Sequence, residues 1–600
     1  YIERGLAVTV PAATPLRAVP DTAGAGYGSA TAAAPVYSIT NVQVEGVDED
    51  DIVKTNGTHI FVLMQESGDS GTLRVYKAYP PEDLSLSYEL DVCGYITSLM
   101  PEYGNVEVRV QLGETLRIYK YPISYDIECR TLGLYVLQDG RAIVIAYTRL
   151  LSNILYDTRT WLVEVKPDGE VGKVYWVDGA FRASRMVSEE GLLALITVKP
   201  SYTTLGPTTP IRTSSGEIGA EKVFLVGYPE VYTIVTVIDL ETWSEDTIAY
   251  LSSGGDTTLY MTPEGEIYVA ASNDPWSSAI AVIKKATPQP LRSNGQEPVE
   301  IKGNLLVIDT EKLRSSCGSG VTRCIFGEAA TAGPKTLIVH FRVNGASIGL
   351  VGSTVIDGLV RKPWQLDEYK GYLRVAADAA GGWRGRVALY VIDSETMEKV
   401  SELNITVNER IHGVRFMGDR LYIVTYRNVD PLYVVDLSDP YNPVILGYLK
   451  GPGFDEYLHP IGEGYLLGIG LTDDRQLRVT LYRINSDSVD RLDQVVLGDF
   501  ITPIIYDVKK GHRAFVFDPL HDYALIPAPS VGVLVVKIEG NYSLRLAGIL
   551  EHRGAVRALY IGDYIYTVSW RALVPSSILS SEAPVIKVFD AQTLRLVASA

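Results

Sequence analysis

The sequence has 600 residues, of which 46% are hydrophobic and 21% charged, and its formal net charge is −18 at pH 7. This composition excludes a disordered chain, and the acidic balance argues against nucleic acid as a partner, because phosphate binding requires clustered Lys and Arg. No apolar run reaches the roughly 20 residues of a spanning helix, so we expect no membrane span in this chain. Its length exceeds what one ordinary core supports, which favours a repeat architecture.

The first 34 residues differ from the rest of the chain. Residues 11–34 are rich in Ala, Pro, Gly and Thr without any period, which is typical of a linker, whereas Leu6–Val10 alternate as a strand does. A lone strand needs the edge of another sheet, so we expect residues 1–34 to connect subunits or to fold back onto residues 35–600. The start at Tyr1 rather than Met hints at a signal peptide already removed.

From about Val36 onward, strand-sized apolar runs alternate with turns of Gly, Asp, Asn or Pro, and helical periodicity is nearly absent. Several strands end in an aspartate before a turn, and one interval between such aspartates matches the roughly 40 to 45 residues of a four-stranded propeller blade. We therefore predict an all-β propeller over residues 35–600, with eight blades favoured and seven to nine possible. Insertions are expected near residues 290 and 320, and a strand near 36–44 is expected to close the ring against the C-terminal units. The repeated aspartates are Asp239, Asp309, Asp393, Asp436 and Asp590.

Several segments resemble one known family. ITNVQVEGVDEDDIVKT at Ile39–Thr55, WQLDEYKGYLRVAA from Trp364, the long stretch from Val414, HRAFVFDP from His512 and LYIGDYIYTVS from Leu559 are similar to archaeal and bacterial secreted proteins with a β-propeller domain, distantly related to WD-repeats. The resemblance covers nearly everything after the linker. It implies a propeller fold and export, and it implies no catalytic residues.

The cysteines and glycosylation sequons agree with an exported protein. Four cysteines form two sequence-local pairs, which we interpret as two disulfides, with four buried free thiols as the alternative. Three N-x-S/T sequons are present, and two of them lie in predicted hairpin tips where a glycan is tolerated. The residues are Cys93 with Cys129, Cys317 with Cys324, and the sequon asparagines Asn56, Asn404 and Asn541.

Two groups of residues are candidates for metal or ligand binding. The acidic run Asp48-Glu49-Asp50-Asp51 has oxygen ligands suited to calcium, although it lacks the spacing of a calcium loop, and a solvated or capping acidic turn is the favoured alternative. Four histidines begin or precede inner strands at roughly blade-length intervals, so imidazoles from successive blades can bind a transition metal or a small anion at the pore mouth. Local hydrogen bonding is the favoured alternative for these residues, which are His412, His459, His512 and His552.

We expect a noncatalytic protein at the cell surface that assembles with itself, as an oligomer or filament, or with other envelope proteins. Gly345-Ala346-Ser347-Ile348-Gly349 matches the G-x-S-x-G nucleophile pattern, but strands flank it instead of the strand-turn-helix that the nucleophile requires. No cofactor is firmly implied. The alternatives are a propeller with a metal or small-ligand site in its axial channel, which includes a propeller enzyme, and a module that binds carbohydrate or peptide through tyrosine-bearing loops.

Overall fold

The computed structural model describes residues 35–600 with internal gaps. The gaps are residues 66–70, 101–104, 113–114, 123–124, 153–155, 204–205, 208–210, 227–229, 253–254, 274–298, 303–304, 309–333, 379–385, 408, 427–429, 452, 463, 501, 503–510 and 570–584. Residues 1–34, including the predicted strand and linker, lie outside the described residues.

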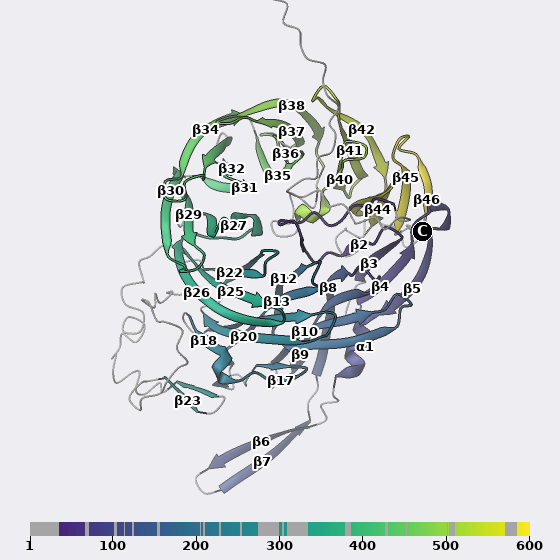
Figure 1. Cartoon of the computed structure of the whole chain (residues 1–600). Helices are drawn as coiled ribbons and strands as arrows, with labels where there is room; N and C mark the ends of the chain where they lie inside the picture. The colour runs from purple at the N-terminus through teal and green to yellow at the C-terminus, as the bar shows by residue number, and fades with distance from the viewer. Residues whose placement is uncertain are drawn as a thin grey trace, which may run out of the picture.

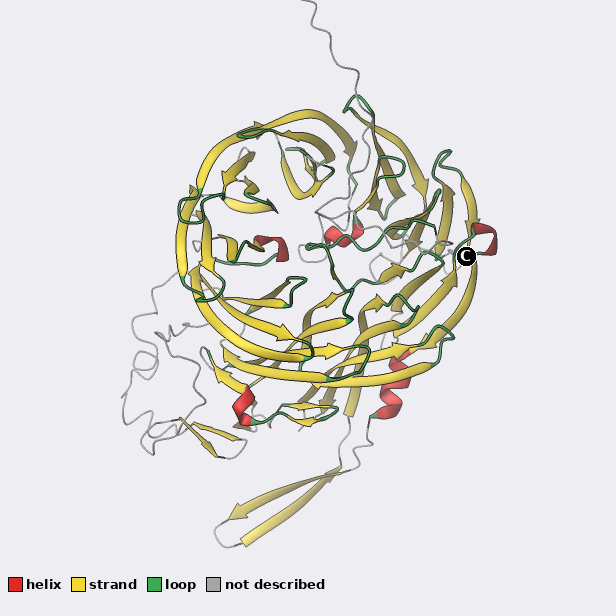
Figure 2. Cartoon of the chain, in the orientation of Figure 1, coloured by secondary structure: helices red, strands yellow, loops and turns green. Residues whose placement is uncertain are grey.

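The described chain forms nine antiparallel sheets arranged as blades around one axis (Figure 1). Each blade contains four strands in chain order from the axis outward, so we number the blades one to nine along the chain. Nine is one more than the eight blades that the repeat pattern favoured, and it lies within the predicted range of seven to nine. Figure 2 shows that strands make up nearly all of the ring and that the helices are short.

The blades share the same meander order. Blade one contains β2 (Val53–Thr55), β3 (His59–Gln65), β4 (Gly71–Lys77) and β5 (Ser85–Asp91). Blade two contains β8 (Tyr125–Val136), β9 (Ala142–Ser152), β10 (Tyr156–Val165) and β11 (Val171–Asp178). Blade three contains β12 (Ala180–Val187), β13 (Leu192–Pro200), β19 (Val231–Asp239) and β20 (Glu245–Ser252). Blade four contains β21 (Asp256–Met261), β22 (Glu266–Asn273), β25 (Lys335–Asn344) and β26 (Ser347–Asp357).

The remaining five blades follow in chain order with the same four-strand arrangement. Blade five contains β27 (Leu366–Tyr369), β28 (Tyr372–Asp378), β29 (Arg386–Asp393) and β30 (Lys399–Val407), and blade six contains β31 (Arg410–Met417), β32 (Arg420–Tyr426), β33 (Asp430–Asp436) and β34 (Val444–Gly451). Blade seven contains β35 (Phe454–Pro460), β36 (Tyr465–Leu471), β37 (Leu477–Ile484) and β38 (Val489–Gly498). Blade eight contains β39 (Val516–Asp518), β40 (Tyr523–Ala528), β41 (Gly532–Ile538) and β42 (Leu544–Glu551), and blade nine contains β43 (Ala555–Ile561), β44 (Tyr564–Ser569), β45 (Ile586–Asp590) and β46 (Leu596–Ser599).

Shorter elements decorate the ring. A two-residue strand, β1 (Val47–Asp48), pairs with β12 on the axial side, and β18 (Val223–Leu225) pairs in parallel with β20 on the outer side. The others are α1 (Val92–Leu99), β6 (Asn105–Leu112), β7 (Thr115–Pro122), β14 (Tyr202–Thr203), β15 (Gly206–Pro207), β16 (Arg212–Thr213), β17 (Gly216–Glu217), β23 (Val299–Lys302), β24 (Leu305–Ile308), η1 (Pro81–Asp83), η2 (Ala220–Lys222), η5 (Pro363–Gln365) and η6 (Gly511–Ala514).

Strand order assigns the larger of these additions to one face of the ring. In an antiparallel meander, the turn between the second and third strands lies at the same end as the link to the next blade. The helix α1 and the hairpin β6–β7 lie in such a link, and residues 274–334 separate β22 from its direct partner β25. The predicted insertions near 290 and 320 fall within residues 274–298 and 309–333, which lie outside the described residues.

Apolar packing between neighbouring blades holds the ring together. The middle strands are buried on both sides; β13, for example, has only its last residue partly exposed. The ring closes where residues of blade nine pack against residues of blade one in a single apolar cluster, and Tyr566 Oη donates to the Ala78 carbonyl at 2.6 Å. Closure adds the antiparallel bridge between Tyr37 and Ile561, which confirms the predicted pairing of the segment after the linker with the C-terminal units.

The repeated aspartates organise the turns between third and fourth strands. The Asp239 carboxylate accepts from Thr242 N at 3.0 Å, Asp393 from Thr396 N at 2.8 Å, and Asp590 from Thr593 N at 2.7 Å. The residue four positions after each of these aspartates adopts a left-handed conformation, with φ of 60°, 55° and 55° at Trp243, Met397 and Leu594. Asp436 accepts from Ser438 N in a related turn, and Asp309 lies outside the described residues.

Removing one turn carboxylate is expected to cost about 1 kcal/mol of unfolding free energy, the net value of a typical hydrogen bond. The Thr396 backbone N–H holds the pKa of the Asp393 carboxyl below its ordinary value, so the carboxylate is ionised and accepts this bond at neutral pH. We expect urea denaturation to show this loss for Asp393→Ala and only a small loss for Asp393→Asn, which keeps the acceptor oxygen. If Asp393→Ala and Asp393→Asn lost the same unfolding free energy, the side-chain oxygen that accepts from Thr396 would not be what stabilises the turn.

Candidate functional site

Residues 36–52, which we call the axial segment, run through the centre of the ring (Figure 1). The segment starts against β43 of blade nine, and Asn41 Nδ2 then donates to Tyr457 Oη of blade seven at 2.7 Å. Gln43 Nε2 donates to the carbonyl of Leu366 in blade five at 2.8 Å. The strand β1 then pairs with blade three, and Asp51 bridges to Leu134 of blade two before blade one begins. A single stretch therefore contacts most of the ring.

The acidic run 48–51 ends this segment, and its carboxylates pair with cations from different parts of the ring. Asp48 pairs with Lys54 Nζ at 2.6 Å. Asp51 pairs with Arg557 Nη2 of blade nine at 3.0 Å. Asp50 pairs at 3.1 Å with Nη1 of Arg513, a residue of η6 in the link that leads into blade eight. The expectation of a solvated acidic turn is therefore wrong, because the side chains of residues 49–51 are buried. Asp48 and Asp51 also accept from the backbone N–H groups of Glu49 and Ile52, as capping carboxylates do.

Glu49 has the largest set of partners in the acidic run. Its carboxylate lies 2.9 Å from Arg513 Nε, 3.3 Å from Arg185 Nη2 and 3.1 Å from His512 Nε2. Burial opposes ionisation, but Arg185, His512 and Arg513 together hold the pKa of Glu49 well below its usual range. Burial lowers the pKa of His512, so a neutral ring donates Nε2–H to the ionised carboxylate.

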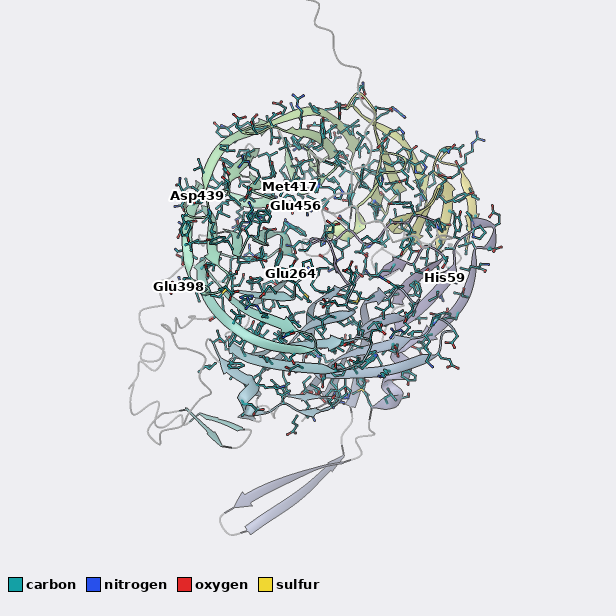
Figure 3. The ribbon with its side chains drawn as sticks, in the orientation of Figure 1. His59, Glu264, Glu398, Met417, Asp439 and Glu456 are labelled. Carbon is teal, nitrogen blue, oxygen red and sulfur yellow. A yellow bond between two sulfur atoms is a disulfide. The ribbon has the colours of Figure 1, made fainter. Side chains whose placement is uncertain are left out.

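The other predicted histidines also have local partners. His412 Nδ1 lies 2.8 Å from Glu456 Oε2, and Lys362 Nζ lies 2.7 Å from Glu456 Oε1, near the centre of the ring where Figure 3 labels Glu456. His552 Nδ1 lies 2.7 Å from Thr567 Oγ1, and His459 Nδ1 lies 3.0 Å from Tyr457 Oη. Among the described residues, no group of three or more His, Cys, Asp or Glu side chains is arranged to hold a metal ion. A calcium or transition-metal site stays a prediction.

Composition and spacing did not single out the basic side chains around the axis. Arg185, Arg415 and Arg557 lie in the first strands of blades three, six and nine, and Arg513 lies in η6. The signal available in the sequence was an arginine recurring in first strands, as in ASRMV, GVRFM and AVRAL. An arginine inside an apolar strand needs a partner, because an isolated buried charge is costly.

The predicted disulfides and the predicted glycosylation sites have different outcomes. Cys93 in α1 and Cys129 in β8 form a disulfide, which confirms the first pair, whereas Cys317 and Cys324 lie outside the described residues. Asn56 and Asn541 lie in turns that the meander order places on the face opposite to α1, and Asn404 is exposed on the outer strand β30. Occupancy of these sequons by glycans stays a prediction.

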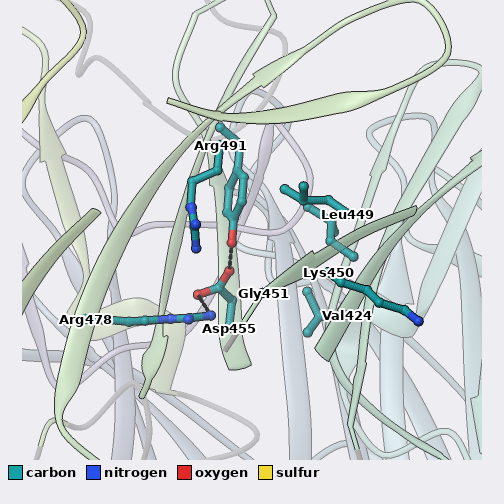
Figure 4. A pocket seen from close by; sticks show the side chains of 9 residues that line it. Val424, Leu449, Lys450, Gly451, Asp455, Arg478 and Arg491 are labelled. Atoms are coloured by element: carbon teal, nitrogen blue, oxygen red, sulfur yellow. Dashed lines mark hydrogen bonds and ion pairs between the residues drawn. The ribbon is translucent and has the colours of Figure 1, made fainter. Parts of the chain in front are cut away.

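A small cleft lies between blades six and seven (Figure 4). Its volume is about 20 Å³, enough for roughly one water molecule. Asp455 accepts from Tyr482 Oη at 2.6 Å and from Arg478 Nη2 at 3.2 Å, and burial together with the Asp455 charge raises the pKa of Tyr482 well above its usual range. Lys450 and Arg491 also line the cleft, which therefore has three cations and one carboxylate in an acidic protein.

The chain was compared with known protein families. Residues 37–580 match the family described as the beta propeller domain. The chain belongs to this family. The match begins at the axial segment and continues into the gap before β45, so the propeller comprises nearly all of the described residues.

Two archaeal proteins are similar to this chain over most of its length. The propeller is 28% identical over 575 residues to the uncharacterized protein MJ1554 of Methanocaldococcus jannaschii, which covers 89% of this chain and 80% of that protein. It is also 28% identical over 578 residues to an uncharacterized protein of Archaeoglobus fulgidus, covering 89% of this chain and 81% of that protein.

Similarity to solved structures is weaker. A chain from a study of two prolyl endopeptidases has a TM-score of 0.32 and 12% identity, covering 81% of this chain and 54% of that chain, so the propeller spans about half of its length. A chain of a mitotic checkpoint complex has a TM-score of 0.29 and 9% identity, covering 59% of this chain and 85% of that chain. No helix in the described part of the propeller is long and apolar enough to cross a bilayer.

Proposed function

We propose that this propeller is a noncatalytic, exported surface protein that assembles by strand addition. In the proposed assembly, Leu6–Val10 of one copy pair with the outer edge of β34 in another copy. The observation that supports this proposal is the apolar character of that edge, where Val444 and Tyr448 are exposed to 45% and 57%. An unpaired edge strand with exposed apolar side chains is a template for pairing with another strand.

The chain before the axial segment has the strand-forming residues and the length that pairing with another copy requires. Leu6–Val10 are apolar and β-branched, as strands are. A generic flexible chain as long as residues 11–34 would span roughly 25 to 30 Å, which is a reach suited to a connector. The disulfide between Cys93 and Cys129 supports an exported location, because disulfides persist in oxidising compartments.

Deleting residues 1–34 tests the connector. We expect the truncated protein to remain folded and to become monomeric by light scattering, whereas the full chain forms oligomers or filaments that negative-stain imaging detects. The double variant Val444→Lys/Tyr448→Lys should also be monomeric, because charged side chains on an edge strand oppose pairing.

The control places one lysine on the outer strand of a different blade. Leu86→Lys alters β5 of blade one, where Leu86 is exposed to 48%, and should leave assembly unchanged. Oligomers that persist after the deletion would overturn the role of residues 1–34. Oligomers that require residues 1–34 but tolerate the lysines on β34 would overturn the choice of edge.

A further inference from the structure

Arg415 occupies the same position in blade six as Arg185 does in blade three. In both first strands, a β-bulge interrupts the pairing, and the arginine is the third residue after it: the bulge precedes Ala183 in β12 and Gly413 in β31. Both side chains are buried. The two arginines therefore lie at the same level of the ring.

The two arginines differ in their partners. Arg185 pairs with Glu49, and Arg557 of blade nine pairs with Asp51. Arg415 has no carboxylate oxygen within 4.0 Å among the described residues, and its Nε has no hydrogen-bond partner. The charge of Arg415 influences the pKa of Asp367, but Arg374 Nε already donates to that carboxylate at 2.8 Å. Two guanidinium groups thus share one carboxylate, and a buried charge without a counterion is costly.

His459 provides a second unused donor beside Arg415. In β35 the bulge precedes Tyr457, so His459 is also the third residue after it, on the blade next to β31. Tyr457 Oη accepts from Asn41 Nδ2 and therefore donates its only proton to His459 Nδ1. Burial and the nearby Arg415 lower the pKa of His459 to about 3, so the ring is neutral and carries its proton on Nε2. That buried Nε2–H has no acceptor in the part of the chain that the structure describes.

Two hydrogen-bond acceptors nearby have no donor. Asn41 contacts both Tyr457 Oη and the His512 carbonyl, yet its Oδ1 has no hydrogen-bond partner among the described residues. His512 donates Nε2–H to Glu49, which leaves Nδ1 as an acceptor, and this atom has no partner in the described part of the chain either. The Tyr457 ring lies between these residues, 6.4 Å from the His512 ring and 5.9 Å from the His459 ring.

We propose that Arg415 and His459 bind a small oxyanion that also carries a hydroxyl group, such as hydrogenphosphate, on the axial side of blades six and seven. Its anionic oxygens accept from the Arg415 guanidinium and from His459 Nε2–H, and its hydroxyl donates to Asn41 Oδ1 or His512 Nδ1. The ligand supplies the negative charge that Glu49 and Asp51 supply for the other two arginines. Arginine is well suited to this role, because its fork of donors matches phosphate and carboxylate oxygens.

Thermal unfolding and calorimetry of the full chain in inorganic phosphate, at constant ionic strength against sodium chloride, test the site. We expect phosphate to raise the unfolding midpoint in a saturable manner and sulfate, which has no hydroxyl at neutral pH, to bind more weakly. Arg415→Gln and His459→Phe should each weaken phosphate binding about tenfold or more, since each removes a hydrogen bond to a charged group. Arg545→Gln, which removes an exposed guanidinium paired with Glu539, is the control and should bind normally.

A second measurement separates a binding role from a structural one. In phosphate-free buffer, Arg415→Gln should unfold at the same temperature as the unsubstituted protein or higher, because it removes a buried charge that lacks a counterion. Glycerol phosphate distinguishes a free phosphate ion from the phosphate group of a larger molecule. If it raises the unfolding midpoint as much as inorganic phosphate does, the site accepts the phosphate group of a larger molecule. If it does not raise the midpoint, the site binds the free ion. Phosphate that stabilises no more than chloride, or that binds Arg415→Gln as tightly as the unsubstituted protein, would overturn the proposal.

Discussion

Replacing Glu49 with glutamine is expected to lower the free energy of unfolding by about 3 to 5 kcal/mol, the cost of breaking a buried ion pair from one side. The substitution keeps the size of the side chain but leaves Arg185 and Arg513 buried without this counterion. Because the axial segment links most of the blades, the loss should appear as one shift of the whole urea transition. A transition that splits, with only a few blades unfolding early, would contradict this description of the segment.

The exposed pair between Glu89 and Arg74 on blade one provides the matched control. Glu89→Gln also removes a carboxylate beside an arginine, but it does so at the surface, where an ion pair contributes roughly 0 to 1 kcal/mol. The two variants therefore separate the effect of burial from the effect of charge. Similar losses in both would show that the Glu49 network contributes no more than a surface pair.

The cost of Glu49→Gln should also depend on pH, with a sign that follows from the pKa shift. The folded protein holds the pKa of Glu49 well below the ordinary value of 4.5. The stability that ionised Glu49 contributes is therefore fully present above about pH 4.5 and is lost as the pH falls toward the folded pKa. The difference between the two proteins should be constant from pH 6 to 8 and should shrink below pH 4.5. A difference that grows on acidification would contradict this assignment.

Loss of the disulfide between Cys93 and Cys129 is expected to have the second large effect, about 2 to 4 kcal/mol. The two cysteines are 36 residues apart, and closing a loop of that length restricts the unfolded chain by about 4 kcal/mol in the chain-entropy description. The bond joins α1 to the first strand of blade two inside an apolar cluster, so the folded state also loses packing when both residues become alanine.

Urea denaturation of Cys93→Ala/Cys129→Ala, with and without a reducing agent, measures this effect. Reductant should lower the stability of the unsubstituted protein toward that of the variant, and it should change the variant little. A variant as stable as the oxidised protein would show that the bond is unimportant. A variant that still loses stability in reductant would indicate a contribution from the second pair, Cys317 and Cys324.

Local patterns in the sequence were sufficient for the repeating parts of the fold. Hairpin turns, strand alternation and the aspartates that end third strands depend on neighbours within a few residues, so the all-β blades and their turns followed directly. The blade count was harder, because residues 274–334 divide blade four and insertions also divide blade three. Those insertions disrupt the spacing from which repeats are counted.

The sequence by itself determined the class of fold, the turn aspartates, the first cysteine pair and the region of ring closure, because each depends on local spacing or composition. Only the tertiary structure decided what the acidic run does: Glu49 and Arg513 are 464 positions apart, and nothing in either neighbourhood indicates the other. The same holds for Arg415 and Arg185: the axial segment places Glu49 beside Arg185, and it places no carboxylate beside Arg415 among the described residues. Closing nine blades around one segment brings these charges together and buries them. Because a buried charge without a partner is costly, each ion pair, or the lack of one, then changes the free energy of unfolding.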